Sequence, residues 1–125
     1  MTENEIAKTD MENIQKKVLG CIGLASRARK CIFGTEMCVE YMRKDKGCLL
    51  IVAYGISENT KKKLVKTATY HKIPYYISDI DKSILAHSAG KISDTSAILI
   101  TDKNFTAIIQ NLNVEIHITD TEVLD

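Results

Sequence analysis

The sequence predicts a three-layer α/β/α sandwich with a central mixed sheet of about four strands. Segments with apolar residues at helical spacing alternate with short apolar segments along most of the chain. The short segments, such as CLLIVAYG at residues 48–55, are apolar throughout, which is typical of strands buried on both faces. With 125 residues, 45% of them apolar and 26% charged, the chain has the composition of one globular domain.

The first helix is expected to start near Asp10, whose side chain can cap it, and to end in the basic segment 27–30. Residues 1–9 are polar and are predicted to form a flexible N-terminus. The segment KCIF then predicts a short strand or extended link. The main domain is therefore expected to begin at residue 10.

Two helices flank the long central strand at 48–55. The first of these, TEMCVEYMRKD, opens after Gly34, and Thr35 is its expected N-cap. The second, ENTKKKLVKTATYHK, follows Ser57, which can cap it in the same way. Its lysines are expected to face away from the core.

The remaining segments continue the alternation up to residue 112. IPYYIS predicts a strand with Pro74 at its start, and DKSILAHSAG predicts a short helix that ends at Gly90. SAILIT then predicts another strand, and DKNFTAIIQNL predicts a closing helix. Residues 10–112 are thus predicted to form the domain. Residues 113–125 are a C-terminal extension in which apolar and polar residues alternate, so it is expected to add an edge strand or to contact a partner, with its acidic end frayed.

The composition restricts the partners. The formal net charge is +1, so any binding of nucleic acid requires a local basic surface. No apolar run approaches the roughly 18 residues of a membrane span, and the start of the chain lacks the pattern of a signal peptide. A cytoplasmic protein without a membrane partner is expected.

Motifs for catalysis or cofactor binding are missing from the sequence. The two glycine-rich phosphate-binding motifs, G-x-G-x-x-G and G-x-x-x-x-G-K-[ST], do not occur in the sequence. The histidines lack a nucleophile or carboxylate partner at useful spacing. Asp79 and Asp81 are expected to cap the short helix rather than to act as paired acids. The four cysteines have no C-x-x-C spacing and are expected in the core, so neither a metal nor a cofactor is predicted, and the protein is not expected to be an enzyme.

The cations indicate a binding surface. Arg27, Arg29 and Lys30 are close in sequence to Gly34, where a helix N-terminus would favour phosphate. The alternative is a solvated helix end. The lysines at 61–63 offer a second basic face. The alternative is that these lysines only make the helix surface soluble.

Several motifs together resemble one family. The order of these motifs is the one seen in bacterial YlxQ-type proteins. They are GLASRARK at residues 23–30, Gly34, LLIVA, SENTKKK, IPY and SAG before Lys91. YlxQ-type proteins are small relatives of the ribosomal proteins L-seven-Ae and L-thirty-e, which bind kink-turn RNA, a sharply bent duplex. The resemblance covers about residues 12–112.

This resemblance implies the same sandwich and a non-catalytic, ribosomal-protein-like function in which structured RNA is bound. The start of the second helix would enter the bent groove, with the loops at 54–58 and about 85–89 completing the contact. Ribosomal or other kink-turn-containing RNA is the implied partner, together with ribosome or RNA-processing proteins. The predicted RNA-binding residues are Arg27, Arg29, Lys30, Gly34, Thr35, Glu36, Met37, Lys61, Lys62 and His87.

The chain departs from the family pattern at some expected contacts. Glu36-Met37 replaces Asn-Glu, Glu40 replaces a lysine, Gly55 replaces an acid, and Ala86-His87 replaces Gly-Arg. The alternative role of Glu36 is to stabilise the helix dipole, as an acid in the first helical turn does. A second hypothesis is therefore a protein-interaction or ribosome-assembly module of the same fold that has lost kink-turn recognition.

Overall fold

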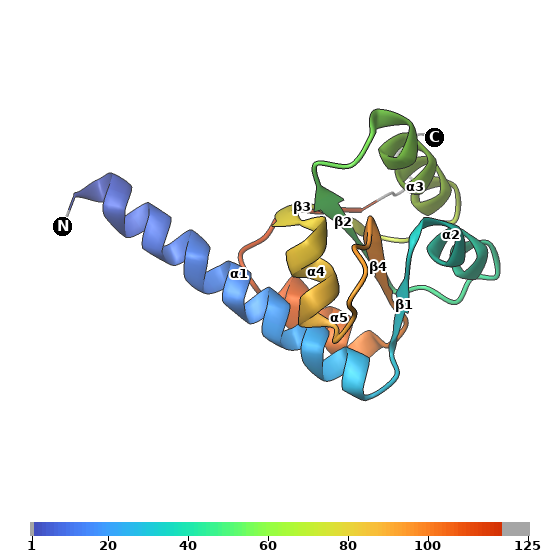
Figure 1. Cartoon of the computed structure of the whole chain (residues 1–125), viewed down its shortest axis with the longest axis horizontal. Coiled ribbons are helices and arrows are strands. Elements are labelled where there is room, and N and C mark those ends of the chain that lie inside the picture. Colours follow the sequence, from blue (N-terminus) through green and yellow to red (C-terminus); the bar gives the residue numbers. More distant parts are fainter. Residues whose placement is uncertain (1, 119–125) are drawn as a thin grey trace.

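A computed structural model describes residues 2–118, with the backbone alone for residues 4–9. Helices and strands alternate along it, as Figure 1 shows. The elements are α1 (Glu3–Arg27), β1 (Cys31–Phe33), α2 (Thr35–Arg43), β2 (Leu49–Tyr54), α3 (Glu58–Tyr70), β3 (Tyr75–Asp81), α4 (Lys82–Ser88), β4 (Ala97–Ile100), α5 (Lys103–Gln110) and β5 (Ile116–His117).

The five strands form one mixed sheet in the order β1-β4-β2-β3-β5. Strand β4 lies between β1 and β2 and is antiparallel to both, so β1 and β2 run parallel to each other. Strand β3 continues the parallel direction beside β2, and β5 closes the edge in the antiparallel sense. The carboxyl ends of β1, β2 and β3 therefore meet at one edge of the sheet, which also receives the start of β4.

Helices cover both faces of the sheet, which confirms the predicted α/β/α sandwich. Alternate residues of β2 point into two cores: Leu49 and Ile51 into one, Leu50 and Val52 into the other. The first core is closed by α1, α4 and α5 and the second by α2 and α3 (Figure 1). The central strand is fully buried up to Ala53 because each of its faces meets a helical layer.

The structure differs from the prediction at the ends of the chain. Helix α1 begins at Glu3 rather than near Asp10, and its first turns extend away from the body of the molecule (Figure 1). The sheet has five strands rather than about four because Ile116 and His117 pair with β3, as expected for an edge strand. Stacking of the His117 ring on Tyr75, with centroids 4.8 Å apart, accompanies this pairing. The predicted fraying concerns residues 119–125, which lie outside the described residues.

Side-chain caps fix the starts of α3, α4 and α5, and two of these caps were predicted. The Ser57 hydroxyl accepts the N–H of Thr60, and Asp81 accepts the N–H of Ser83, as expected. Asp102 begins α5 and accepts the N–H groups of both Asn104 and Phe105. The prediction for Thr35 was wrong by one residue, because the N-cap of α2 is Gly34.

The cysteines lie in or beside the core. Cys21, Cys31 and Cys38 are buried, and Cys48 is half-buried. Burial raises the pKa of the Cys31 and Cys38 thiols to about 12, because a thiolate would lose its hydration there. The described residues contain no group of three or more acids, histidines or cysteines able to hold a metal ion.

These pKa values predict unreactive thiols. At pH 8 a thiol with a pKa of about 12 has roughly a thousandfold less thiolate than one at 9.0. We expect iodoacetamide to modify Cys31 and Cys38 far more slowly in the native protein than in urea, as followed by peptide mass spectrometry. The half-buried Cys48 is the internal control and should react first. Native-state modification of Cys38 at its unfolded rate would contradict this assignment.

Candidate nucleic-acid interface

Gly34 joins β1 to α2 in a backbone conformation that favours glycine. Its φ of 85° and ψ of 154° lie in a region that side chains with a Cβ rarely adopt. The pairing of Phe33 with Ile98 brings Gly34 against the start of β4. There, its N–H donates to the Thr95 hydroxyl at 3.0 Å and lies 3.3 Å from the Ala97 carbonyl oxygen.

Thr95 fixes the loop that leads from α4 to β4, here called the α4–β4 loop (residues 89–96). Its side chain is buried, and its hydroxyl donates to the Ala97 carbonyl at 2.7 Å while accepting from Gly34. Its N–H donates to the Lys82 carbonyl at 3.3 Å. A buried hydroxyl with both partners is costly to displace, so the loop and the start of α2 form one unit.

A shallow groove of about 460 Å³ lies between the start of α2 and the α4–β4 loop. We call it the tip groove; its lining residues are Phe33, Gly34, Gly90, Lys91, Ile92, Ser93, Asp94 and Thr95. Ile92 is exposed to 102% of its reference area. The Lys91 ammonium lies 4.7 Å from the centre of the Phe33 ring, a cation–π contact that holds a positive charge beside Gly34.

The N-terminus of α2, which begins at the Gly34 wall of this groove, adds donors beside it. Gly34 has no side chain, and the helix start has no side-chain cap among the described residues. The first intrahelical bond is the one from Cys38 N–H to the Gly34 carbonyl at 3.0 Å. The N–H groups of Thr35, Glu36 and Met37 therefore remain available at the positive end of the helix dipole.

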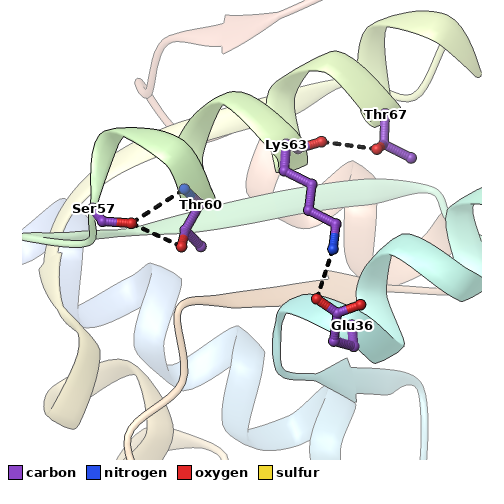
Figure 2. A network of polar contacts seen from close by, with 5 residues as sticks. All are labelled: Glu36, Ser57, Thr60, Lys63 and Thr67. Atoms are coloured by element: carbon purple, nitrogen blue, oxygen red, sulfur yellow. Dashed lines mark hydrogen bonds and ion pairs between the residues drawn. The ribbon is translucent and has the colours of Figure 1, made fainter.

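An ion pair joins the start of α2 to α3. The Lys63 ammonium lies 2.7 Å from the Glu36 carboxylate, as Figure 2 shows. Both side chains are exposed, so the pair adds little stability and its ends can be recruited by a ligand. The backbone carbonyl of Lys63 accepts from the Thr67 hydroxyl at 2.8 Å (Figure 2).

The β2–α3 turn lies at the same edge of the sheet. Gly55 follows the parallel strand β2 with a φ of 81°, and Tyr54 before it is exposed. The Ala53 N–H donates to the Ser96 carbonyl at 2.8 Å, which places this turn beside the α4–β4 loop. Three segments far apart in sequence, namely the start of α2, the β2–α3 turn and the α4–β4 loop, thus share one edge.

The structure divides the sequence-predicted residues into separate groups. Gly34, Thr35, Glu36 and Met37 lie together at the start of α2, with Glu36 and Met37 exposed. In contrast, Arg27, Arg29 and Lys30 are exposed at the opposite end of β1, so the strand separates them from Gly34 (Figure 1). Their nearness to Gly34 in sequence does not carry over to the structure, because a strand of three residues lies between them. Their binding to RNA stays a prediction.

The remaining predicted residues lie away from the tip groove. Lys61 and Lys62 line a different groove on α3, with Val65 and Ile77 in its wall. It is their neighbour Lys63 that reaches α2. His87 is exposed on α4 and is not among the residues that line the tip groove.

Sequence reasoning missed Lys91, Ile92 and Thr95, and it placed Lys63 in the basic face at 61–63 without including it among the predicted RNA-binding residues. For Ile92 a signal existed, since it is an isolated aliphatic residue in the polar stretch GKISDTS. An apolar side chain flanked by polar residues in a loop is a reasonable candidate for contact with a partner. The role of Thr95 depends on a bond across 61 residues of sequence, so no local pattern reveals it.

Comparison with known proteins shows the family. Residues 16–110 match the Ribosomal protein L7Ae/L30e/S12e/Gadd45 family, and the chain belongs to it. Among the described residues, no helix combines the length and apolarity that a membrane span requires.

The chain is similar to proteins of the YlxQ type within this family. It is 31% identical over 84 residues to the RNA-binding protein YlxQ of Bacillus subtilis (strain 168), covering 67% of this chain and 82% of that protein. It is 38% identical over 65 residues to the RNA-binding protein YlxQ of Enterococcus faecium, covering 52% of this chain and 63% of that protein. The match supports the predicted assignment to YlxQ-type proteins.

Two solved structures share the fold. A protein of unknown function from Bacillus halodurans C superposes with a TM-score of 0.69 at 28% identity, covering 76% of this chain and 98% of the other. The Giardia lamblia 15.5kD RNA binding protein gives a TM-score of 0.64 at 12% identity, covering 80% and 84%. The second likeness concerns the fold alone.

The backbone at the tip yields a stability prediction. We expect Gly34→Ala to lower the free energy of unfolding by about 1–3 kcal/mol, because alanine resists a φ of 85° although space for a Cβ is open. Gly20→Ala, inside α1 and equally free of clashes, is the matched control and should gain up to about 1 kcal/mol. Urea denaturation of both variants gives the comparison. Equal effects in the two would show that Gly34 is not required for its conformation.

Proposed function

We propose that the protein is a non-catalytic, ribosomal-protein-like RNA-binding protein that recognises kink-turn-like RNA through the tip groove. The observation that carries the proposal is the joining of the uncapped start of α2 to the α4–β4 loop through the Gly34–Thr95 hydrogen bond. Helix N–H donors, a cation and an exposed aliphatic side chain are thereby held together. The YlxQ relatives named as RNA-binding proteins support this reading.

Each component of the groove suits a bent RNA. A kink opens base edges that the deep, narrow groove of a regular RNA helix hides, so a helix tip can reach them. The free N–H groups and Lys91 suit phosphate. Ile92 offers an apolar surface against which an unstacked base can pack.

Glu36 and Lys63 have complementary tasks in this proposal. The Glu36 carboxylate can accept hydrogen bonds from a guanine edge; stabilising the helix dipole is an equally simple role for it. When Glu36 turns to a base, Lys63 becomes free to contact phosphate. The exposed position of their ion pair makes this exchange inexpensive.

Arg27, Arg29 and Lys30 form a second, non-specific contact in our proposal, and Lys61, Lys62 and His87 remain predicted contacts only. We infer a cytoplasmic location with ribosomal or other structured RNA as the partner. Ribosome or RNA-processing proteins are further proposed partners.

The alternative is a protein-interaction or ribosome-assembly module that has kept the fold without kink-turn recognition. Glu40 favours it, because this acid lies one turn beyond Glu36 on α2. The negative charge of Glu40 would repel RNA phosphates there. Its ion pair with Lys44, at 3.0 Å, reduces this repulsion in part. The two proposals differ in whether a bent RNA is preferred over a straight one.

Direct titration separates these proposals. We expect a generic kink-turn RNA to bind at least tenfold more tightly than a straight duplex of equal length, measured by fluorescence anisotropy at two salt concentrations. Ile92→Asp should remove most of this preference, because it places a negative charge where a base would pack. Ile84→Asp is the matched control, since Ile84 is an exposed aliphatic residue on α4 outside the tip groove. Equal, weak and salt-erased binding to both RNAs would favour the protein-interaction module.

The basic turn gives a separate prediction. Replacing both Arg27 and Arg29 with alanine should reduce the affinity for kinked and straight RNA by similar factors. The slope of the logarithm of the binding constant against the logarithm of the salt concentration should fall by the equivalent of about one to two phosphate contacts. The preference for the kinked RNA should persist, because the two arginines lie across β1 from the tip groove. A loss of that preference alone would place these arginines at the kink instead.

A further inference from the structure

A second groove runs between α2 and α3, on the face of the sheet that these helices cover. It has a volume of about 590 Å³ and is lined by Arg43, Lys63, Lys66, Thr67, Tyr70 and His71. The helices run in the same direction, since Glu36 at the start of α2 meets Lys63 and Asp45 just after its end meets His71. Lys63 lines this groove and also pairs with Glu36, so its side chain links the groove to the start of α2.

Tyr70 presents an aromatic ring at the far end of this groove. Its residue is 81% exposed, so the ring contributes little to the core. The ring meets the edge of His71, with centroids 5.0 Å apart and planes at 72°. His71 is itself mostly buried and lies 3.2 Å from the Asp45 carboxylate through Nδ1. This chain of contacts orients an otherwise unused aromatic surface toward solvent.

The charges beside Tyr70 favour an anionic ligand. Arg43 and Lys66 form no ion pair with any described residue, whereas the nearby acids are engaged: Glu40 with Lys44, Asp45 with His71, and Glu36 with Lys63. Two unpaired cations flanking an exposed ring match the pattern of single-stranded nucleic-acid sites, in which cations follow phosphates and rings stack on bases.

We propose that this groove binds a single-stranded RNA segment that continues from the RNA held at the start of α2. One base stacks on Tyr70, and Arg43 and Lys66 contact the adjoining phosphates. The proposal rests on the proposed function, which it extends by naming a second RNA element. RNA suits this groove better than a protein segment because Tyr70 is its single large exposed apolar surface, flanked by cations. The α3 groove beside Lys61 and Lys62 shares Lys66 with this groove but differs from it, since Val65 and Ile77 contribute apolar walls there.

The test compares blunt kink-turn RNA with the same RNA carrying a single-stranded extension of about four uridines, at the 5′ end or at the 3′ end. We expect one of the two extensions to tighten binding at least fivefold, as measured by fluorescence anisotropy. Tyr70→Ala should abolish this gain and Tyr70→Leu should retain little of it, whereas Tyr70→Phe should preserve it. Binding of the blunt RNA should be the same in all of these variants.

Replacing Arg43 and Lys66 together with glutamine should also remove most of the gain and its salt dependence. The matched control is Lys16→Gln with Lys17→Gln, which removes two exposed cations from α1, on the other face of the sheet, and should leave the gain unchanged. If neither extension adds affinity while blunt kinked RNA still binds, this inference is overturned, the proposed function stands, and the groove is open to a protein partner. If kinked RNA binds no better than straight duplex, the proposed function fails and this inference fails with it.

Discussion

The hydrogen bond from Gly34 N–H to the buried Thr95 hydroxyl is the contact on which the candidate interface depends. It joins two segments that the sheet only brings near each other: the start of α2 and the loop entering β4. Thr95 completes its own hydrogen bonding by donating to Ala97 inside β4. Because both ends of this link are anchored in the sheet, the loop that carries Lys91 and Ile92 has a defined position relative to the helix tip. Such prior positioning limits the ordering cost when a ligand binds.

The scaffold and the surface obey different physical requirements. Two buried cores close on β2 from both sides, and they need apolar side chains but no particular surface chemistry. The edge where β1 and β2 end has a different chemistry: it carries unpaired backbone donors, exposed charge and an exposed isoleucine. A near-neutral net charge is compatible with binding RNA only if this local arrangement supplies the attraction. Membership of the L7Ae/L30e/S12e/Gadd45 family accounts for the scaffold.

Most of the fold was predictable because its signals are local. The continuous apolar run of β2, the caps Ser57 and Asp81, and the inward stripe of α3 can each be read from a few adjacent residues. The candidate site was less predictable because it depends on the topology of the sheet. Arg27 and Arg29 are near Gly34 in sequence, yet β1 separates them, whereas Lys91 and Thr95 are distant in sequence and lie beside it. The early start of α1 was missed because residues 3–9 are polar and carry no apolar stripe, and the strand at Ile116–His117 was predicted only as one of two alternatives because so short a segment gains its structure from pairing with β3.

The central claim is that one edge of the sheet, built around the Gly34–Thr95 bond, is the surface that meets RNA. The most direct test is to record backbone amide NMR spectra during titration with a kink-turn RNA. The largest shift changes should fall on residues 34–37 and 91–95. Changes confined to the turn at 27–30 or to the Lys61–Lys62 face of α3, with the amides of Gly34 and Thr95 unmoved, would contradict the claim.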